Sequence, residues 1–131
     1  MPKAPMHALL VLAALAGLGA GCIEPEENEA DDIAMLEALE KEIDALIGDT
    51  ACTGGADCRA VAFGAKPCGG PWTYKIFSAA EVDTAEVLRR IAAYNNFNAR
   101  LNETWNWASD CAFVTEPAVG CVEGTCQAVI P

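Results

Sequence analysis

The sequence predicts an α+β fold: a small disulfide-stabilised domain with two helices and a short antiparallel sheet. Two segments have apolar residues at the helical period, and several short segments with strand composition lie between turn residues. Six cysteines fall between residues 52 and 126, an even set that is typical of a disulfide framework. The region from residue 50 onward is near the smallest size at which an apolar core suffices, so bridges are expected to support it.

Residues 1–21 have the organisation of a cleavable signal peptide. Lys3 and the amino terminus form a weakly positive start, an apolar run covers residues 8–18, and small residues follow it. The run is too short to cross a bilayer as a helix, which takes roughly 20 residues. The competing interpretation is an N-terminal membrane anchor that stays attached.

The segment Leu18-Gly19-Ala20-Gly21-Cys22 resembles the lipobox of bacterial lipoproteins. In that family the cysteine sulfur receives a diacylglycerol, and cleavage before the cysteine makes it the first mature residue. The match departs from the common pattern at Gly19, because the large aliphatic residue usually found there lies one position earlier. The resemblance implies a covalent lipid on Cys22 and no other cofactor. The alternative is ordinary secretion with a spare thiol.

A lipid on Cys22 would make the membrane a partner of the mature protein without any transmembrane helix. The family chemistry implies three acyl chains, and two hydrophobic signals already suffice for stable anchoring. An aspartate directly after the cysteine often retains lipoproteins in the inner membrane, whereas this chain has Ile23 at that position. The expected location is therefore the bacterial cell envelope, with the outer membrane favoured.

Charge divides the remaining chain into two parts. Residues 24–49 hold eleven acidic residues and one base, whereas the chain from residue 50 onward has eight acids and six bases. The segment 22–29 has a run of charges, a proline and little to bury, so we predict a disordered acidic tether with a reach of about 15 Å. We expect no nucleic-acid partner, because no basic surface would neutralise phosphates.

A six-cysteine domain is expected over residues 30–131, with an acidic helix at 30–48 and a disulfide core at 50–131. Asp31 and Asp32 favour the N-terminal end of the helix, and Gly48 is placed to end it. We expect the apolar stripe of this helix to pack against its own domain, and a coiled-coil seam or partner-binding face is the alternative. The stripe comprises Ile33, Leu36, Leu39, Ile43, Leu46 and Ile47.

A second helix is expected from residue 84 to about 101. Asp83 and Glu86 resemble a capping pair, while Ser78 offers an earlier start. Asparagines lower helix propensity, so several of them are expected to be exposed or bonded to loops; an amide face for a sugar or peptide is the alternative. The asparagines are Asn95, Asn96, Asn98 and Asn102. The apolar period runs through Val87, Leu88, Ile91, Tyr94 or Asn95, Asn98 and Leu101.

Short strands are expected at residues 59–63 and 73–77 and on both sides of the turn Glu123-Gly124. A two-residue hairpin at that turn places Cys121 opposite Cys126, where a cross-strand disulfide is one arrangement. The alternative gives these two cysteines other partners, such as Cys52 and Cys58. A Cys68–Cys111 pair would close the loop that contains the second helix. In the chain-entropy model this bond would stabilise the domain by about 4 kcal/mol. The disulfide set is Cys52, Cys58, Cys68, Cys111, Cys121 and Cys126.

Catalytic and metal-binding chemistry is restricted by missing residue types. The only histidine is His7, inside the leader, so the mature chain lacks Ser/His and Cys/His mechanisms and histidine-bearing zinc sites. No Cys-x-x-Cys pair occurs, and Asp49 and Asp57 lack the pattern of a calcium loop, so no metal site is expected. A pair of carboxylates could act on a glycoside, but no spacing singles one out, and no enzyme is expected. The candidates are Glu81, Asp83, Glu86, Asp110 and Glu116.

The loop at residues 64–72 is the most distinctive internal segment, because glycines and prolines surround Cys68. A braced loop that displays Lys66 suggests a protease inhibitor, although Pro67 directly after the basic residue argues against trypsin-like engagement. The segment resembles a group of small cysteine-rich exported bacterial proteins with no assigned activity. Such a resemblance transfers no function.

Tryptophans supply the best candidate binding residues. Trp72, Trp105 and Trp107 offer stacking faces for a carbohydrate or peptide, and an extended Trp105-Asn106-Trp107 segment would place two rings on one face. With Lys66, they form the candidate binding set. The sequence therefore favours a lipid-anchored module that binds an envelope protein or glycan. The alternatives are a carboxylate-based envelope enzyme, a disulfide-braced protease inhibitor and a purely structural envelope protein.

Overall fold

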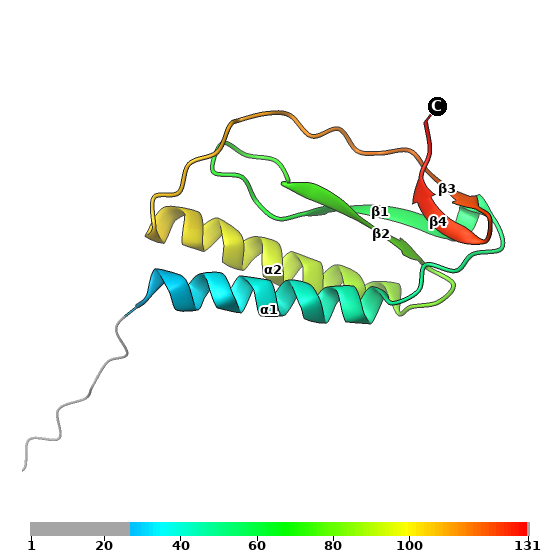
Figure 1. Ribbon diagram of the computed structural model, residues 1–131, viewed down its shortest axis with the longest axis horizontal. Coiled ribbons are helices and arrows are strands. Elements are labelled where there is room, and N and C mark those ends of the chain that lie inside the picture. Colours follow the sequence, from blue (N-terminus) through cyan, green and yellow to red (C-terminus); the bar gives the residue numbers. More distant parts are fainter. Residues whose placement is uncertain (1–26, 131) are drawn as a thin grey trace, which may run out of the picture.

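The computed structural model describes residues 27–130 and confirms the disulfide-stabilised α+β class. Two antiparallel helices lie side by side along a β-hairpin, and a second, shorter hairpin lies at one end of the molecule (Figure 1). The structure thus has two small sheets where the sequence predicted one. The elements are α1 (Glu29–Ile47), η1 (Gly55–Asp57), β1 (Cys58–Phe63), β2 (Thr73–Ser78), α2 (Thr84–Thr104), β3 (Val119–Val122) and β4 (Thr125–Ala128).

The predicted signal peptide, the lipid on Cys22 and most of the tether lie outside the described residues. Within residues 27–130, no helix is both long enough and apolar enough to cross a membrane.

Helix α1 begins at Glu29, one residue before the predicted start, because Asn28 caps it. The Asn28 side chain accepts a hydrogen bond from Ala30 N at 2.9 Å. Gly48 ends the helix with a φ of 55°, as predicted. Most of the predicted stripe packs on the core, but Ile33 is 41% exposed, which corrects the prediction. Ile33 lies roughly 60° around the helix from Leu36, at the edge of the stripe.

Helix α2 begins at Thr84, as predicted, because Asp83 caps it. Asp83 Oδ1 accepts hydrogen bonds from Ala85 N at 3.0 Å and Glu86 N at 3.2 Å. The earlier start at Ser78 is wrong, since Ser78 ends β2. The helix extends to Thr104, past the predicted end. Leu88 was assigned to the buried face but is 43% exposed.

The apolar core lies between the two helices and the β1–β2 hairpin. Its most buried members are Phe77, Val87 and Ile91, each at most 1% exposed. Phe63 from β1 stacks on Tyr94 from α2, with ring centroids 4.2 Å apart and planes inclined by 19°. One hairpin face is therefore covered by helices.

Lys75 of β2 joins the hairpin to α1. Its Nζ lies 2.7 Å from carboxylate oxygens of both Glu40 and Asp44, and 4.6 Å from the centroid of the Phe63 ring. Burial by itself would lower the pKa of Lys75, but the hydrogen bonds to Asp44 and Glu40 outweigh it and raise the pKa. The ammonium thus stays charged between the two acids.

The β3–β4 hairpin has the predicted turn and register. Glu123 and Gly124 have φ values of 51° and 76°, and Cys121 is the Cα partner of Cys126. The cysteines nevertheless bond elsewhere, so the cross-strand disulfide is wrong. The disulfides are Cys52–Cys121, Cys58–Cys126 and Cys68–Cys111.

The segment after α1 explains why Cys121 and Cys126 have separate partners. Cys52 N donates to Gly124 O at 2.9 Å, and Cys126 N donates to Thr50 O at 2.8 Å. This pairing adds the segment 50–52 beside β4 and brings Cys52 next to Cys121. The start of β1 brings Cys58 to Cys126. Two disulfides therefore connect the short hairpin to two different segments that precede it.

Candidate functional site

Four aromatic residues from different segments of the chain meet at one cleft, which has a volume of about 340 Å³. The cleft lies where the β1–β2 loop meets α1 and the C-terminal half of α2. Two of the predicted binding residues, Trp72 and Trp107, line it, whereas Trp105 and Lys66 do not. The lining residues are Leu36, Glu40, Phe63, Gly64, Trp72, Thr73, Tyr94, Asn98 and Trp107.

Asparagines on α2 hold the loop that forms one wall of the cleft. Asn95 Oδ1 accepts from Gly64 N at 2.7 Å, and Asn95 Nδ2 donates to Ala62 O at 3.0 Å. One amide therefore satisfies two backbone groups at the end of β1, where the hairpin ladder stops. This finding confirms the prediction that asparagines of this helix bond to a loop.

Asn98 and Asn102, on the following turns of α2, also bond to the backbone of the loop. Asn98 Oδ1 accepts from Ala65 N at 2.8 Å, and Asn102 Nδ2 donates to Ala65 O at 2.8 Å. The spacing of Asn95, Asn98 and Asn102 places all three on one helix face. Their amides therefore form a row along residues 62–65, whereas the sequence predicted contacts with a loop without saying which loop.

Asn98 also leaves a donor next to the cleft. The residue is 4% exposed and lines the cleft, and within residues 27–130 its Nδ2 donates to no protein acceptor. This nitrogen is not among the fully buried unpaired atoms of residues 27–130, so water in the cleft can bond to it, and a ligand that enters can replace that water. The Asn98 amide is therefore the best-placed group in the cleft for a hydrogen bond to a bound molecule.

Trp72 forms the outer wall of the cleft and is 44% exposed. Its backbone N donates to Phe63 O at 3.0 Å, which closes the loop at residues 64–72. A Cβ on Gly64 would lie 2.7 Å from Trp72 Cδ1, and Gly64 has a φ of 78°. Both the indole position and the backbone conformation therefore require glycine at residue 64.

Lys66 is buried beneath the loop instead of being displayed by it, which corrects the prediction. Its side chain is 4% exposed, and Nζ donates to Asp110 Oδ1 at 3.0 Å and to Ala112 O at 2.8 Å. The ammonium also lies 5.1 Å from the Trp72 ring centroid. A protease inhibitor that presents Lys66 to solvent is incompatible with this position, and Lys66 instead supports Trp72.

The ion pair of Lys66 fixes the chain after α2 to the loop. The backbone N–H of Ala112, and next the hydrogen bond from Lys66, lower the pKa of Asp110 below its ordinary value. The exposed disulfide Cys68–Cys111 connects the same two segments. The loop is thus held from both sides, by α2 through its asparagines and by residues 110–112.

Both tryptophans at the end of α2 contact the first turn of α1. Trp105 Nε1 donates to Asp32 at 3.0 Å, and Trp107 Nε1 donates to Glu29 at 2.6 Å. The extended arrangement expected for residues 105–107 is wrong, because Trp105 closes α2 and Asn106 has a φ of 51°. Only Trp107 reaches the cleft.

The cleft combines ring faces with a few polar groups. Trp72, Trp107 and Phe63 supply aromatic surface, while Asn98 and Thr73 supply hydrogen-bonding groups. Burial, with a smaller effect of the Glu40 charge, raises the pKa of Tyr94, so its hydroxyl stays protonated at neutral pH. This combination suits stacking and hydrogen bonding to a neutral ligand.

Three of the five carboxylates considered for catalysis have structural partners. Asp83 caps α2, and Asp110 pairs with Lys66. Hydrogen bonds from Arg90 and Arg89 lower the pKa of Glu86, the opposite direction from that of a general acid near neutral pH. Asp57 accepts hydrogen bonds from Thr53 N and Gly54 N, which makes it a turn residue.

Cys52, Cys58 and Cys126 have Sγ atoms within 4.8 Å of one another. All three sulfurs belong to disulfides, so none is a thiolate that could bind a metal ion. The cluster therefore has a structural role, in which it joins the short hairpin to residue 52 and to the start of β1.

In comparisons with known proteins, the chain matches no protein-family model, no curated protein and no solved structure. The interpretation of the cleft therefore depends on the geometry of its own residues. Phe63, Tyr94 and Asn98 were not among the predicted binding residues, and they enter the site only because β1 and α2 pack together.

Proposed function

We propose that this protein is a lipid-anchored binding module of the bacterial cell envelope, and that its cleft recognises a carbohydrate. The observation that carries the proposal is the meeting of Trp72 and Trp107 with the unpartnered Nδ2 of Asn98 in one cleft. Sugar rings present an apolar C–H face that stacks on indole and hydroxyls that bond to amides. The lipobox-like segment at Cys22 supports the envelope as the location.

The size and charge of the cleft support a small neutral ligand. Its volume of about 340 Å³ is within the range of ligand sites in proteins. Glu40, the charged residue that lines it, is already paired with Lys75 at 2.7 Å. A neutral saccharide therefore meets aromatic faces and amide groups without having to compensate an unpaired charge.

A titration with envelope glycans tests the recognition site. The full chain carrying Cys22→Ser, which removes the sulfur that a lipid requires, is titrated with neutral oligomers of N-acetylglucosamine, a sugar of the envelope glycans, while tryptophan fluorescence is recorded. Trp72→Ala is expected to weaken binding at least tenfold, because the stacking face is lost, and Asn98→Ala is expected to weaken it by about the same factor. Leu88→Ala, an exposed apolar residue outside the cleft, is the matched control.

Absence of saturable binding, or equal affinity for Trp72→Ala and Leu88→Ala, would overturn the assignment of the cleft. Binding of envelope peptides with no binding of glycans would overturn the carbohydrate class. The anchor has a separate test. The intact mass of the protein purified from its own membranes should begin at Cys22, with added acyl chains and six hydrogens fewer than the reduced chain.

A further inference from the structure

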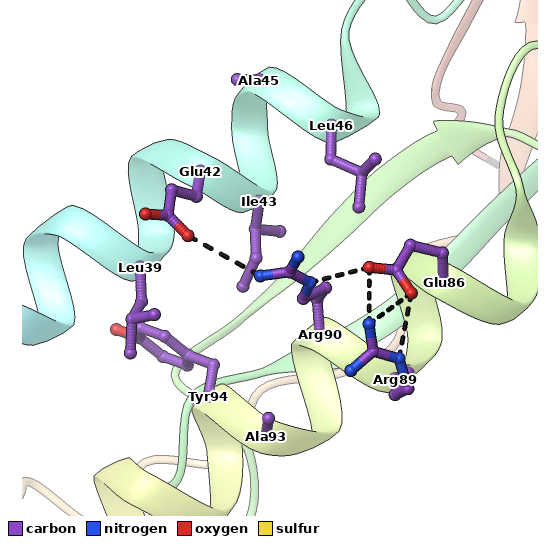
Figure 2. Close-up of a pocket in the computed structure, with 10 residues that line it drawn as sticks. All are labelled: Leu39, Glu42, Ile43, Ala45, Leu46, Glu86, Arg89, Arg90, Ala93 and Tyr94. Carbon is purple, nitrogen blue, oxygen red and sulfur yellow. Dashed lines mark hydrogen bonds and ion pairs between the residues drawn. The ribbon is translucent and has the colours of Figure 1, made fainter.

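A second, larger cavity lies between α1 and α2, with a volume of about 480 Å³ (Figure 2). Leu39, Ile43 and Leu46 from α1 face Ala93 and Tyr94 from α2 across it. Of its lining residues, Tyr94 alone also lines the cleft that contains Trp72 and Trp107. This helix groove therefore has apolar walls of its own, and nothing in the proposed carbohydrate site uses it.

Arg90 extends over the helix groove between two acids. Its Nε donates to Glu86 Oε1 at 2.8 Å, whereas its NH1 lies 3.8 Å from Glu42 Oε2, too far for a hydrogen bond (Figure 2). Within residues 27–130, neither terminal amino group of Arg90 donates a hydrogen bond to the protein. The two amino groups together form the donor fork that binds a carboxylate bidentately.

The charges at the groove mouth leave this fork available. Arg89 also binds Glu86, through Nε at 2.9 Å, so one carboxylate is shared by two guanidinium groups. Glu42 is 64% exposed at its side chain and contributes only the long ion pair. The two acids and two bases that line the groove therefore balance, and the terminal amino groups of Arg90 stay free of a hydrogen bond within residues 27–130, in a chain of net charge -11.

We propose that the helix groove binds an amphiphile with one acyl chain and a carboxylate head. The chain lies against Leu39, Ile43 and Leu46, where burial of its methylenes removes apolar surface from water. The carboxylate pairs with the terminal amino groups of Arg90 and displaces Glu42 from its distant contact. The groove volume is in the range that holds small ligands. The charge complementarity at Arg90 selects an anionic head over a neutral one.

Titration calorimetry with decanoate and decanol tests both parts of the proposal. The full chain carrying Cys22→Ser is expected to bind one decanoate and to bind decanol at least tenfold more weakly, because decanol lacks the charge that pairs with Arg90. Arg90→Gln should lower decanoate affinity about tenfold and leave decanol unchanged. Arg100→Gln is the matched control, since Arg100 is on the same helix, outside the groove and above the Phe97 ring.

Ala93→Trp tests the apolar part by filling the groove, and it should reduce binding of both ligands at least tenfold. Circular dichroism checks that each variant keeps its helix content. Trp72→Ala should leave decanoate binding unchanged, so failure of this proposal and failure of the carbohydrate site are distinguishable. Decanoate affinity that is the same in Arg90→Gln, or unaffected by Ala93→Trp, would overturn the proposal. Absence of binding together with dimers in light scattering would assign the groove to a second copy instead.

Discussion

The two ends of the β1–β2 hairpin are held by different kinds of interaction. At the start of β1, Cys58 and Cys126 are each 4% exposed and bonded to each other, beside the second disulfide Cys52–Cys121. Within residues 27–130, no residue of β3 or β4 belongs to the apolar core cluster. At the opposite end, asparagines and the buried Lys66 hold a loop beside an open cleft.

This difference shows how a small domain divides its stabilising interactions. The short hairpin buries few apolar side chains, so covalent bonds replace the free energy that a core would supply. The loop at residues 64–72 must leave space for the cleft, and directional hydrogen bonds from α2 fix it without filling that space. Four changes would break or sharpen this contrast, beginning with the largest expected effect.

Removal of the buried disulfide by Cys58→Ala with Cys126→Ala should cost about 3 kcal/mol of stability in the chain-entropy model, because the retained Cys52–Cys121 bond keeps the opened loop short, plus the loss of buried sulfur packing. Denaturant unfolding measures the cost, and hydrogen exchange should show that β3 and β4 lose protection first. Cys68→Ala with Cys111→Ala is the control, because it removes a disulfide at exposed positions, where no buried sulfur packing is lost. If the two variants lost the same stability and β3 and β4 stayed protected from exchange, the short hairpin would not depend on its buried disulfide.

Asn95→Ala should cost about 2 kcal/mol, since it leaves Ala62 O and Gly64 N without their partners. Thermal unfolding gives the size of the effect, and the amide of Gly64 should exchange faster. Asn96→Ala is the matched control: Asn96 is exposed on the same helix, so alanine there should be neutral or slightly stabilising. A similar response of both variants would mean that α2 does not hold the loop.

Gly64→Ala should cost about 1 to 2 kcal/mol, because it combines backbone strain with a contact on Trp72. Gly69→Ala separates the two causes. Gly69 has a φ of 96° but open space around its Cβ position, so only the strain of about 1 kcal/mol should appear. Tryptophan fluorescence should change in the Gly64 variant and not in the Gly69 variant. An unchanged spectrum in both would place Trp72 away from residue 64.

The smallest effect is expected from the pH dependence of Asp110. Because its pKa is lowered in the folded chain, it contributes stability that is fully present above its ordinary value of 3.8 and is lost as pH falls through the folded pKa. In the Asp110→Asn variant, the free energy of unfolding should therefore change less steeply with pH below about 4. Chemical denaturation at several pH values measures the slope. Identical slopes in both proteins would show that Lys66 does not depend on this carboxylate.

Local signals predicted most of the fold. The helical period located both helices, Asp83 and Gly48 marked two of their ends, and Glu123-Gly124 identified the hairpin turn with its register. These features depend on residues within one or two turns of each other. The disulfide partners of Cys121 and Cys126 could not be chosen in this way, because they depend on where the segment after α1 pairs.

The cleft was predicted only in part, because its walls come from distant segments. Trp72 and Trp107 were singled out for their ring faces, but Asn98 joins them only through the packing of α2 against the loop. The burial of Lys66 depends on Asp110, which is 44 residues away along the chain. Glycine-rich composition indicated a loop and gave no sign of which side chain would turn inward.

The hydrogen bond from Trp107 to Glu29 joins a wall of the cleft to the first residue of α1. Glu29 directly follows the cap residue Asn28, so this helix turn receives any pull on the chain that precedes it. Tension applied there reaches the indole through a single side-chain contact of 2.6 Å. The proposed lipid anchor on Cys22 would therefore be mechanically coupled to the cleft through this contact, and the shape of the cleft would respond to load.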